Sequence, residues 1–362
     1  MTRAGASLSS RAVAPEVTSP PRTAEEVVRA AWREVLGHDG FTPETDFFDV
    51  GGDSVGLARV AELVAEELSA TLPIETFFDN PTLESLAATL ERAVPRREAP
   101  RPPAPEPPRP RAVSPARSLI SWTSGGEPRQ SVVGVPPLSG GAAVFREWPS
   151  LLPEGIEVLA VRPPGRQSRV HETLSVDVHH VVGEIAEALP RDRAVSLFGY
   201  CAGSLIAFEL ARRLRREDRP LTRLFVAFRG APNLPSYDTG LHALPHDEFL
   251  DRLVTIGAVP EGVRGNQELL RLLEPAMRAD FVLIDNYVFE DGPPLDVPIT
   301  VFVGADDPHF PFDDLAAWRF LTSERFTLRL VEGGHFRNGE SWNPVLDGML
   351  ADLDERPPAS SA

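Results

Sequence analysis

The chain has 362 residues, 42% of them hydrophobic, and a formal net charge of −17. This length predicts two or three domains, and the apolar content is enough to give each domain a core. The acidic balance excludes nucleic acid as an expected partner, because neutralising phosphates needs basic residues.

The sequence also bounds the compartment. It contains no run of eighteen apolar residues and no basic segment followed by an apolar one, so we expect neither a membrane span nor a signal peptide. Cys201 is the single cysteine, which rules out an internal disulfide and fits a reducing cytoplasm.

The first 93 residues divide into a tail and a small helical domain. Residues 1–22 are polar, without a sustained period, and predict a disordered tail. Helical apolar spacing over 24–36, 56–64 and 83–92, with the apolar segment 72–78 between the last two, predicts a small all-α bundle of four helices over 23–93.

A Gly-Gly-Asp-Ser motif ending at Ser54 leads directly into one of these helices. An N-cap serine is the ordinary alternative for such a position. With its flanking helices, however, the segment resembles the peptidyl carrier domains of nonribosomal peptide synthetases. The resemblance implies that Ser54 carries 4'-phosphopantetheine, attached by a phosphopantetheinyl transferase.

This helical segment is also the most acidic part of the chain. Residues 24–93 hold fifteen Asp or Glu against four Arg, a balance of −11. We therefore expect its partners to present basic surfaces.

Two further segments predict irregular chain. Residues 94–118 are rich in proline among charged residues, which favours an extended linker, and the end of the chain, 354–362, predicts a second disordered tail.

Residues 119–353 alternate apolar strands with helical patterns, which predicts a doubly wound, mostly parallel α/β domain. An insertion over about 236–290, with helical patterns inside it, predicts a lid. The expected strands are 131–135, 156–162, 194–199, 222–228, 298–304 and 326–331.

Cys201 follows the third of these strands and precedes a helix, with Gly199 and Gly203 on either side. This is the pattern of a nucleophile elbow, whose strained turn raises the central side chain above the sheet. A buried core cysteine is the alternative. The helix N-terminus favours a thiolate, and the amide of Ala202 is placed to bind an oxyanion.

One residue after each of the last two expected strands completes a triad with Cys201. The chain order of the triad is nucleophile, acid, base. Asp307 is the expected acid, with Asp306 as the alternative, and His335 is the expected base. No metal site is expected. His309 is interpreted as a surface neighbour of the acid.

The loop after the first strand, Pro-Pro-Leu-Ser-Gly-Gly, faces the elbow in an α/β hydrolase. We expect the amide of Ser139 to give the second oxyanion hydrogen bond, with that of Leu138 as the alternative.

Several motifs together resemble the thioesterases associated with peptide and polyketide synthetases, above all their type II subgroup: Arg162-Pro-Pro-Gly-Arg166, Arg229-Gly-Ala-Pro232 and Asp306-Asp307-Pro308. The resemblance implies an α/β hydrolase with a helical lid and places the family's triad on Cys201, Asp307 and His335. Two departures stand out: cysteine replaces the usual serine, and a carrier is fused to the enzyme.

The sequence thus predicts a carrier–thioesterase didomain of a nonribosomal peptide or hybrid polyketide pathway. It takes an acyl, aminoacyl or peptidyl group from phosphopantetheine on Ser54, or on a partner synthetase module or free-standing carrier, and releases it from Cys201 by hydrolysis or cyclisation. The alternatives are an acyltransferase that shuttles the group to another carrier or an amine, and a non-catalytic docking protein.

Overall fold

The computed structural model describes residues 23–68, 71–93, 117–123, 125–236, 239–259, 263–307, 309–335 and 341–354. The predicted tail 1–22 lies outside the described residues. So do residues 94–116 of the predicted linker and 355–362 of the predicted C-terminal tail.

The N-terminal part is a bundle of helices around an aromatic core. Thr23 and Glu26 begin the first helix with a capping box, and Gly37 ends it at a φ of 77° that favours glycine. Trp32 and Phe47 are fully buried at its centre, with ring centroids 5.2 Å apart. The helices are α1 (Ala24–Leu36), α2 (Ser54–Leu68), α3 (Ile74–Asp79) and α4 (Leu83–Ala93).

The second part is built on one seven-stranded sheet with the order β1-β3-β2-β4-β5-β6-β7. Only β1 runs antiparallel, against β3. The strands are β1 (Leu119–Thr123), β2 (Gln130–Val135), β3 (Ile156–Val161), β4 (Val195–Tyr200), β5 (Leu221–Ala227), β6 (Ile299–Gly304) and β7 (Phe326–Val331). All six expected strands are present, and β1 is an additional edge strand.

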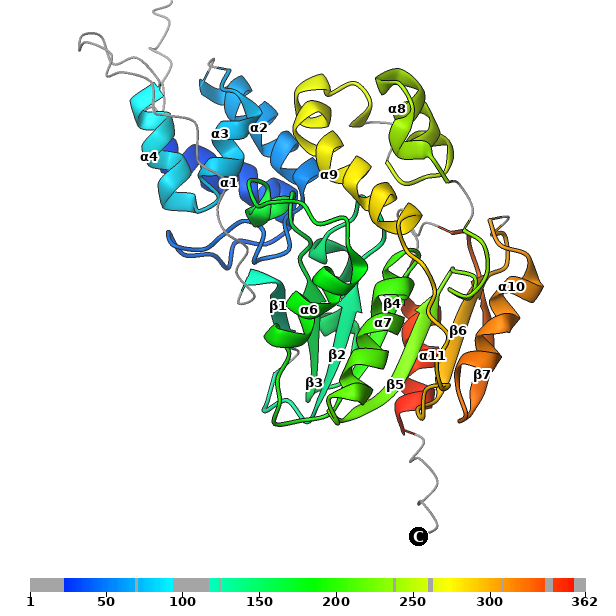
Figure 1. The fold of residues 1–362 in the computed structure, drawn as a ribbon. Coiled ribbons are helices and arrows are strands. Elements are labelled where there is room, and N and C mark those ends of the chain that lie inside the picture. Colours follow the sequence, from blue (N-terminus) through cyan, green and yellow to red (C-terminus); the bar gives the residue numbers. More distant parts are fainter. Residues whose placement is uncertain are drawn as a thin grey trace, which may run out of the picture.

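Helices cover both faces of the sheet, with α6 and α7 on one side and α11 on the other (Figure 1). The central strands β3, β4 and β6 are buried along their whole length, as expected for a parallel sheet between helical layers. The helices are α5 (Trp148–Leu151), α6 (Val178–Ala188), α7 (Gly203–Arg216), α8 (His246–Thr255), α9 (Gln267–Asp285), α10 (Phe312–Ala316) and α11 (Asn343–Asp354).

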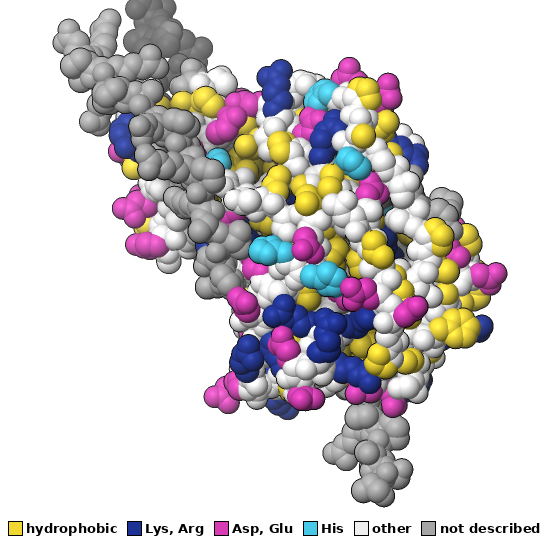
Figure 2. Space-filling model, in the orientation of Figure 1, with side chains coloured by type: hydrophobic (Ala, Val, Ile, Leu, Met, Phe, Trp, Pro, Cys, Tyr) yellow, Lys and Arg dark blue, Asp and Glu magenta, His cyan; other side chains and the backbone are white. Residues whose placement is uncertain are grey.

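Arginine side chains gather on the lower part of the face seen in Figure 2, near the end of α7. Arg213, Arg215 and Arg216 occupy the last turn of that helix, where positive charge is favourable to the helix dipole. None of the described helices is long and apolar enough to span a membrane.

The predicted lid contains α8 and α9, which lie over the carboxyl ends of the strands (Figure 1). The helical bundle lies beside α9 and beyond the β1 edge of the sheet. Buried apolar residues of the bundle and of the lid form one continuous cluster, to which the bundle contributes Trp32 and Phe77 and the lid Phe249 and Phe281. The two parts are therefore packed together.

Candidate active site

Cys201 stands at a sharp turn between β4 and α7. Its φ of 51° lies in the left-handed region, which is rare for a residue with a side chain and is typical of strain at functional sites. A Cβ on Gly199 would lie 2.3 Å from Ser204 Cα, and one on Gly203 would lie 2.4 Å from the carbonyl oxygen of Pro136. Both glycines are therefore required for the elbow to form.

Three predicted residues meet at this edge of the sheet, because β4, β6 and β7 are parallel and end together. His335 Nε2 lies 2.9 Å from Cys201 Sγ. His335 Nδ1 lies 2.9 Å from Asp307 Oδ2. Asp306 is exposed, so Asp307 is the carboxylate that orients the imidazole.

The charges of these groups stabilise one another. Burial alone raises the pKa of the Cys201 thiol, but His335 and Arg229, together with the Ala202 amide, lower it below its usual value. Burial lowers the pKa of His335, yet the Cys201 thiolate and Asp307 raise it to about 10. The arrangement therefore favours a thiolate–imidazolium ion pair at neutral pH.

His309 lies closer to this group than the sequence indicated. Its Nδ1 is 2.9 Å from Asp307 Oδ1, and its ring centroid is 4.4 Å from that of His335. The ligand atoms of these three residues lie within 4.8 Å of one another, a set that could hold a metal ion. Because Asp307 accepts hydrogen bonds from both imidazoles, its pKa stays below the usual value despite burial.

The oxyanion donors differ in part from the prediction. Ala202 follows Cys201 at the start of α7, and its amide forms a hydrogen bond with the Cys201 sulfur that lowers the pKa of the thiol. The amide of Ser139, in contrast, donates a 2.8 Å hydrogen bond to Asp280 Oδ2, so in this arrangement it is not available to an oxyanion. The amide of Leu138, the alternative, makes no hydrogen bond to another described residue, and Leu138 lines the same cavity as Cys201.

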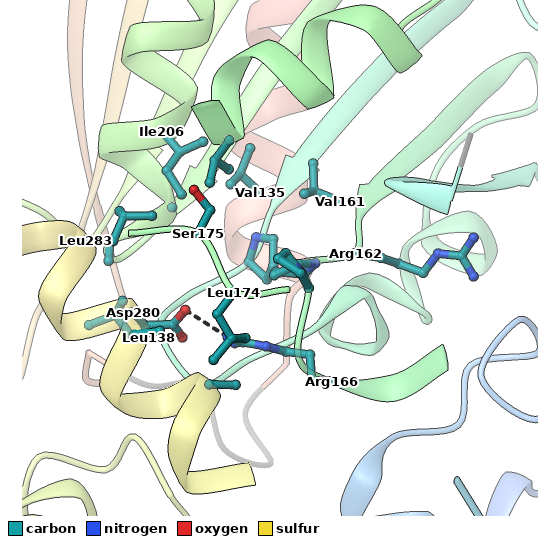
Figure 3. A pocket seen from close by; sticks show the side chains of 18 of the residues that line it. Val135, Leu138, Val161, Arg162, Arg166, Leu174, Ser175, Ile206, Asp280 and Leu283 are labelled. Carbon is teal, nitrogen blue, oxygen red and sulfur yellow. Dashed lines mark hydrogen bonds and ion pairs between the residues drawn. The ribbon is translucent and has the colours of Figure 1, made fainter. Parts of the chain in front are cut away.

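A buried ion pair explains why Ser139 is occupied. Asp280 projects from α9 towards Arg166, whose Nη2 lies 2.7 Å from Asp280 Oδ1 (Figure 3). The same guanidinium donates to the carbonyl oxygen of Gly140. The loop after β2 is thus held from both sides by α9 and by the loop after β3, with Ser139 at a φ of 59°.

Ser54 begins α2, but it does not cap the helix. Asp53 Oδ1 accepts the hydrogen bond from the Gly56 amide at 2.6 Å. The Ser54 hydroxyl makes no hydrogen bond to another described residue and lines a cavity between the bundle and the α/β domain. The N-cap alternative therefore does not account for Ser54, and its hydroxyl is open to attachment of a prosthetic arm.

A second cavity, at Cys201 and His335, is adjacent to this one. The walls at Ser54 include Leu138 and Ala258, and the same two residues line the cavity at Cys201 and His335. An arm on Ser54 would therefore enter a cavity that shares two wall residues with the cavity at the sulfur.

Several hydrogen bonds fasten the bundle to the α/β domain. Asp49 pairs with Arg162 at 2.7 Å, and Asp79 pairs with His171 at 2.6 Å. At the start of α3, the amide of Ile74 donates to Glu268 on α9 at 2.8 Å. The basic partners that the acidic bundle was expected to meet thus include side chains of its own chain.

The fold and the site together define an α/β hydrolase with a sharp strand–turn–helix elbow at Cys201, joined to a small helical domain. Residues 130–351 match the thioesterase domain family and residues 26–90 match the phosphopantetheine attachment site family. The chain belongs to the thioesterase family. These matches confirm the predicted fold class and the expected phosphopantetheine group on a serine.

The chain is similar in sequence or structure to several known proteins. Linear gramicidin dehydrogenase LgrE of Brevibacillus parabrevis is 36% identical over 230 residues, which are 62% of this chain and 88% of the relative. Gramicidin S biosynthesis protein GrsT of Aneurinibacillus migulanus is 33% identical over 223 residues, 60% of this chain and 87% of the relative. The structure of the type II thioesterase BorB from the borrelidin biosynthetic cluster has a TM-score of 0.58 and 31% identity, and covers 64% of this chain and 96% of BorB. The chain is a carrier joined to a thioesterase of natural-product biosynthesis.

Proposed function

We propose that this chain moves an acyl, aminoacyl or peptidyl group from phosphopantetheine on Ser54 to Cys201, and then releases it by hydrolysis or cyclisation. The observation that carries this proposal is that the cavity at Ser54 and the cavity at Cys201 are adjacent and share two wall residues, Leu138 and Ala258. When bound, the prosthetic group supplies a flexible thiol that presents the acyl group as a thioester.

Acylation uses the ion pair. The Cys201 thiolate forms a bond to the acyl carbon, and the amides of Ala202 and Leu138 stabilise the negative oxygen. His335 then gives its proton to the departing sulfur, while Asp307 holds the imidazole in place. The result is an acyl group on Cys201 and a neutral His335.

Release reverses the role of His335. The neutral imidazole takes a proton from the acceptor, which attacks the acyl carbon, and Cys201 leaves as a thiolate. Because sulfur is a better leaving group than a serine oxygen, an acyl-cysteine reacts readily with amines and with other thiols. This observation favours a second candidate function, acyl transfer to another carrier or to an amine.

The carrier of the same chain is the proposed donor. Its contacts through Asp49, Asp79 and Ile74 hold Ser54 at the cavity. A phosphopantetheinyl transferase would load the arm, and upstream synthetase modules would supply the acyl group. The hydrogen-bonded triad argues against a purely non-catalytic docking protein.

The test is peptide-resolved mass spectrometry of the full chain after loading the arm with an acyl group. We expect the wild type to lose the acyl group, Cys201→Ala to keep it on Ser54, and Ser54→Ala to accept no arm. Acyl loss from Cys201→Ala at the wild-type rate would contradict the proposal.

A matched pair of variants separates the two carboxylates. Asp307→Asn should slow acyl loss by orders of magnitude, because the imidazole loses its orienting acceptor. Asp306→Asn, one residue away and exposed, should behave like the wild type.

A further inference from the structure

Arg229 is fixed beside the active site by a strained backbone. It follows β5 directly after Phe228, a buried residue with a φ of 57°. The Phe228 ring packs against Tyr200 and His335, at centroid distances of 5.8 and 6.4 Å. The carbonyl oxygen of Arg229 also accepts a 2.8 Å hydrogen bond from Trp318. These contacts hold the strained turn in one conformation, and with it the start of the Arg229 side chain.

The Arg229 side chain lines the same cavity as Cys201 and His335. Its guanidinium carbon lies 6.0 Å from the ring centre of Phe310. Within the part of the chain that the structure describes, no carboxylate or carbonyl group accepts a hydrogen bond from this guanidinium. Arg162 and Arg166 at the neighbouring loops, in contrast, are each paired with an aspartate.

The positive charge of Arg229 is close to the negative charge of the Cys201 thiolate before acylation, but not after it. Burial lowers the pKa of Arg229 while the Cys201 sulfur raises it, and an arginine remains protonated in either case. A partly buried cation without a counter-ion is costly. Acylation converts Cys201 from a thiolate to a neutral thioester, so at that stage Arg229 loses its nearest negative charge.

Among the described residues that line the cavity, the other carboxylate is already engaged. Asp285 lines it as well, but its carboxylate already accepts from His242 Nδ1 at 2.7 Å and from the Gly240 amide at 3.0 Å. The other walls are largely apolar and suit a short hydrocarbon segment: Leu138, Ile256, Ala258, Phe281 and Ile284. A carboxylate on the bound group would supply the acyl-enzyme with a negative charge beside Arg229.

We propose that Arg229 binds a carboxylate on the acyl group, so that the preferred substrates are acyl thioesters that carry a second, ionised carboxyl group. This inference rests on the proposed function of Cys201 and adds a substrate class to it. The guanidinium has the planar pair of donors that matches a carboxylate.

Alkylation of Cys201 tests the subsite without any turnover. Iodoacetate and iodoacetamide are nearly the same size but differ in charge, and peptide-resolved mass spectrometry isolates their reaction with the single cysteine of the full chain. We expect the rate ratio of iodoacetate to iodoacetamide, divided by that of a free cysteine, to be about tenfold or more in the wild type. Arg229→Met should remove most of this preference, and Arg229→Lys should keep part of it.

A matched control is Arg319→Met. Arg319 also lies over a phenylalanine ring, at 4.5 Å from the centre of Phe320, but it is exposed and away from the cavity. Its variant should keep the wild-type ratio. If Arg229→Met slows both reagents equally, Arg229 serves only to activate the sulfur and the proposal is wrong; an unchanged ratio in both Arg229 variants overturns it as well.

Turnover provides the second test. With glutaryl and pentanoyl thioesters of pantetheine, kcat/KM should favour glutaryl in the wild type and pentanoyl in Arg229→Met, a reversal of tenfold or more. If neither thioester is turned over while the alkylation ratio depends on Arg229, the proposed function fails and the anion subsite stands. If both are turned over with no dependence on Arg229, the subsite fails and the function stands.

Discussion

Replacing His335 by alanine removes the imidazolium that holds the Cys201 thiolate, 2.9 Å from its sulfur. Burial, the largest influence on this thiol, then acts against the charged form with only Arg229 and the Ala202 amide opposing it. We therefore expect the pKa of Cys201 to rise from below its usual value to that value or above it. At pH 7 a thiol with the usual pKa of about 8.5 is only ~3% ionised, so the thiolate population of the variant should be of that size or smaller.

The assay is the rate of alkylation by iodoacetamide between pH 5 and pH 10. The pH midpoint is the decisive quantity, because a thiolate with a lowered pKa is also a weaker nucleophile, which partly offsets the rate at any single pH. The midpoint of the wild type should lie below that of a free thiol and the midpoint of His335→Ala at or above it, while the imidazolium should persist until about pH 10, the raised pKa of His335. Equal midpoints for the wild type and His335→Ala would refute the ion pair.

Three other predictions follow from the elbow and the carrier contacts. Cys201→Ser should accumulate acyl-enzyme and shift products towards free acid, as measured by mass spectrometry; unchanged products at an unchanged rate would remove any special role for sulfur. Gly203→Ala places a Cβ 2.4 Å from backbone carbonyl oxygens and should cost ~1–3 kcal/mol, lowering Tm by several degrees, whereas Gly265→Ala meets nothing within 4 Å and should leave Tm nearly unchanged. Asp49→Arg and Arg162→Asp should each slow transfer from the chain's own carrier by about two- to fivefold; the double swap should recover the rate, and additive losses would show that the pair does not contribute to docking.

The elbow at Cys201 and the contacts of its side chain region with Asp307 and His335 could be predicted from the sequence, because local rules determine both. Gly199 and Gly203 mark a turn that accepts no side chain, and parallel strands bring their carboxyl ends to one edge wherever they lie in the chain. The side chains of Cys201, Asp307 and His335 therefore meet, although 134 residues separate the first from the last.

Other features depend on contacts that no local pattern records. The choice between Ser139 and Leu138 is set by Asp280, which lies 141 residues from Ser139 in the sequence and on a different element. His309 was expected to be only a surface neighbour of the acid. Its spacing of two residues from Asp307 does not reveal that its ring forms a hydrogen bond with the same carboxylate.

The edge strand β1 was not predicted, for a different reason. Only Ile120 among its five residues is buried, so it lacks the continuous apolar pattern of the inner strands. The contacts between the helical bundle and the α/β domain could not be predicted either, because Asp49 pairs with an arginine 113 residues away in the sequence.

Helix α9 contacts both the carrier domain and the loop after β2 that lies opposite the elbow. Near its start Glu268 accepts from the carrier helix α3, and twelve residues further on Asp280 holds the loop opposite the elbow. Pro275, inside the helix, lies between these two contacts and interrupts its hydrogen-bond ladder. Thermodynamic linkage makes any influence along this helix mutual. If the docked carrier stabilises one conformation of the loop after β2, then a loop held in that conformation by a reacting acyl group stabilises the docked carrier by the same free energy. Release of the carrier and the change in loop conformation are then coupled.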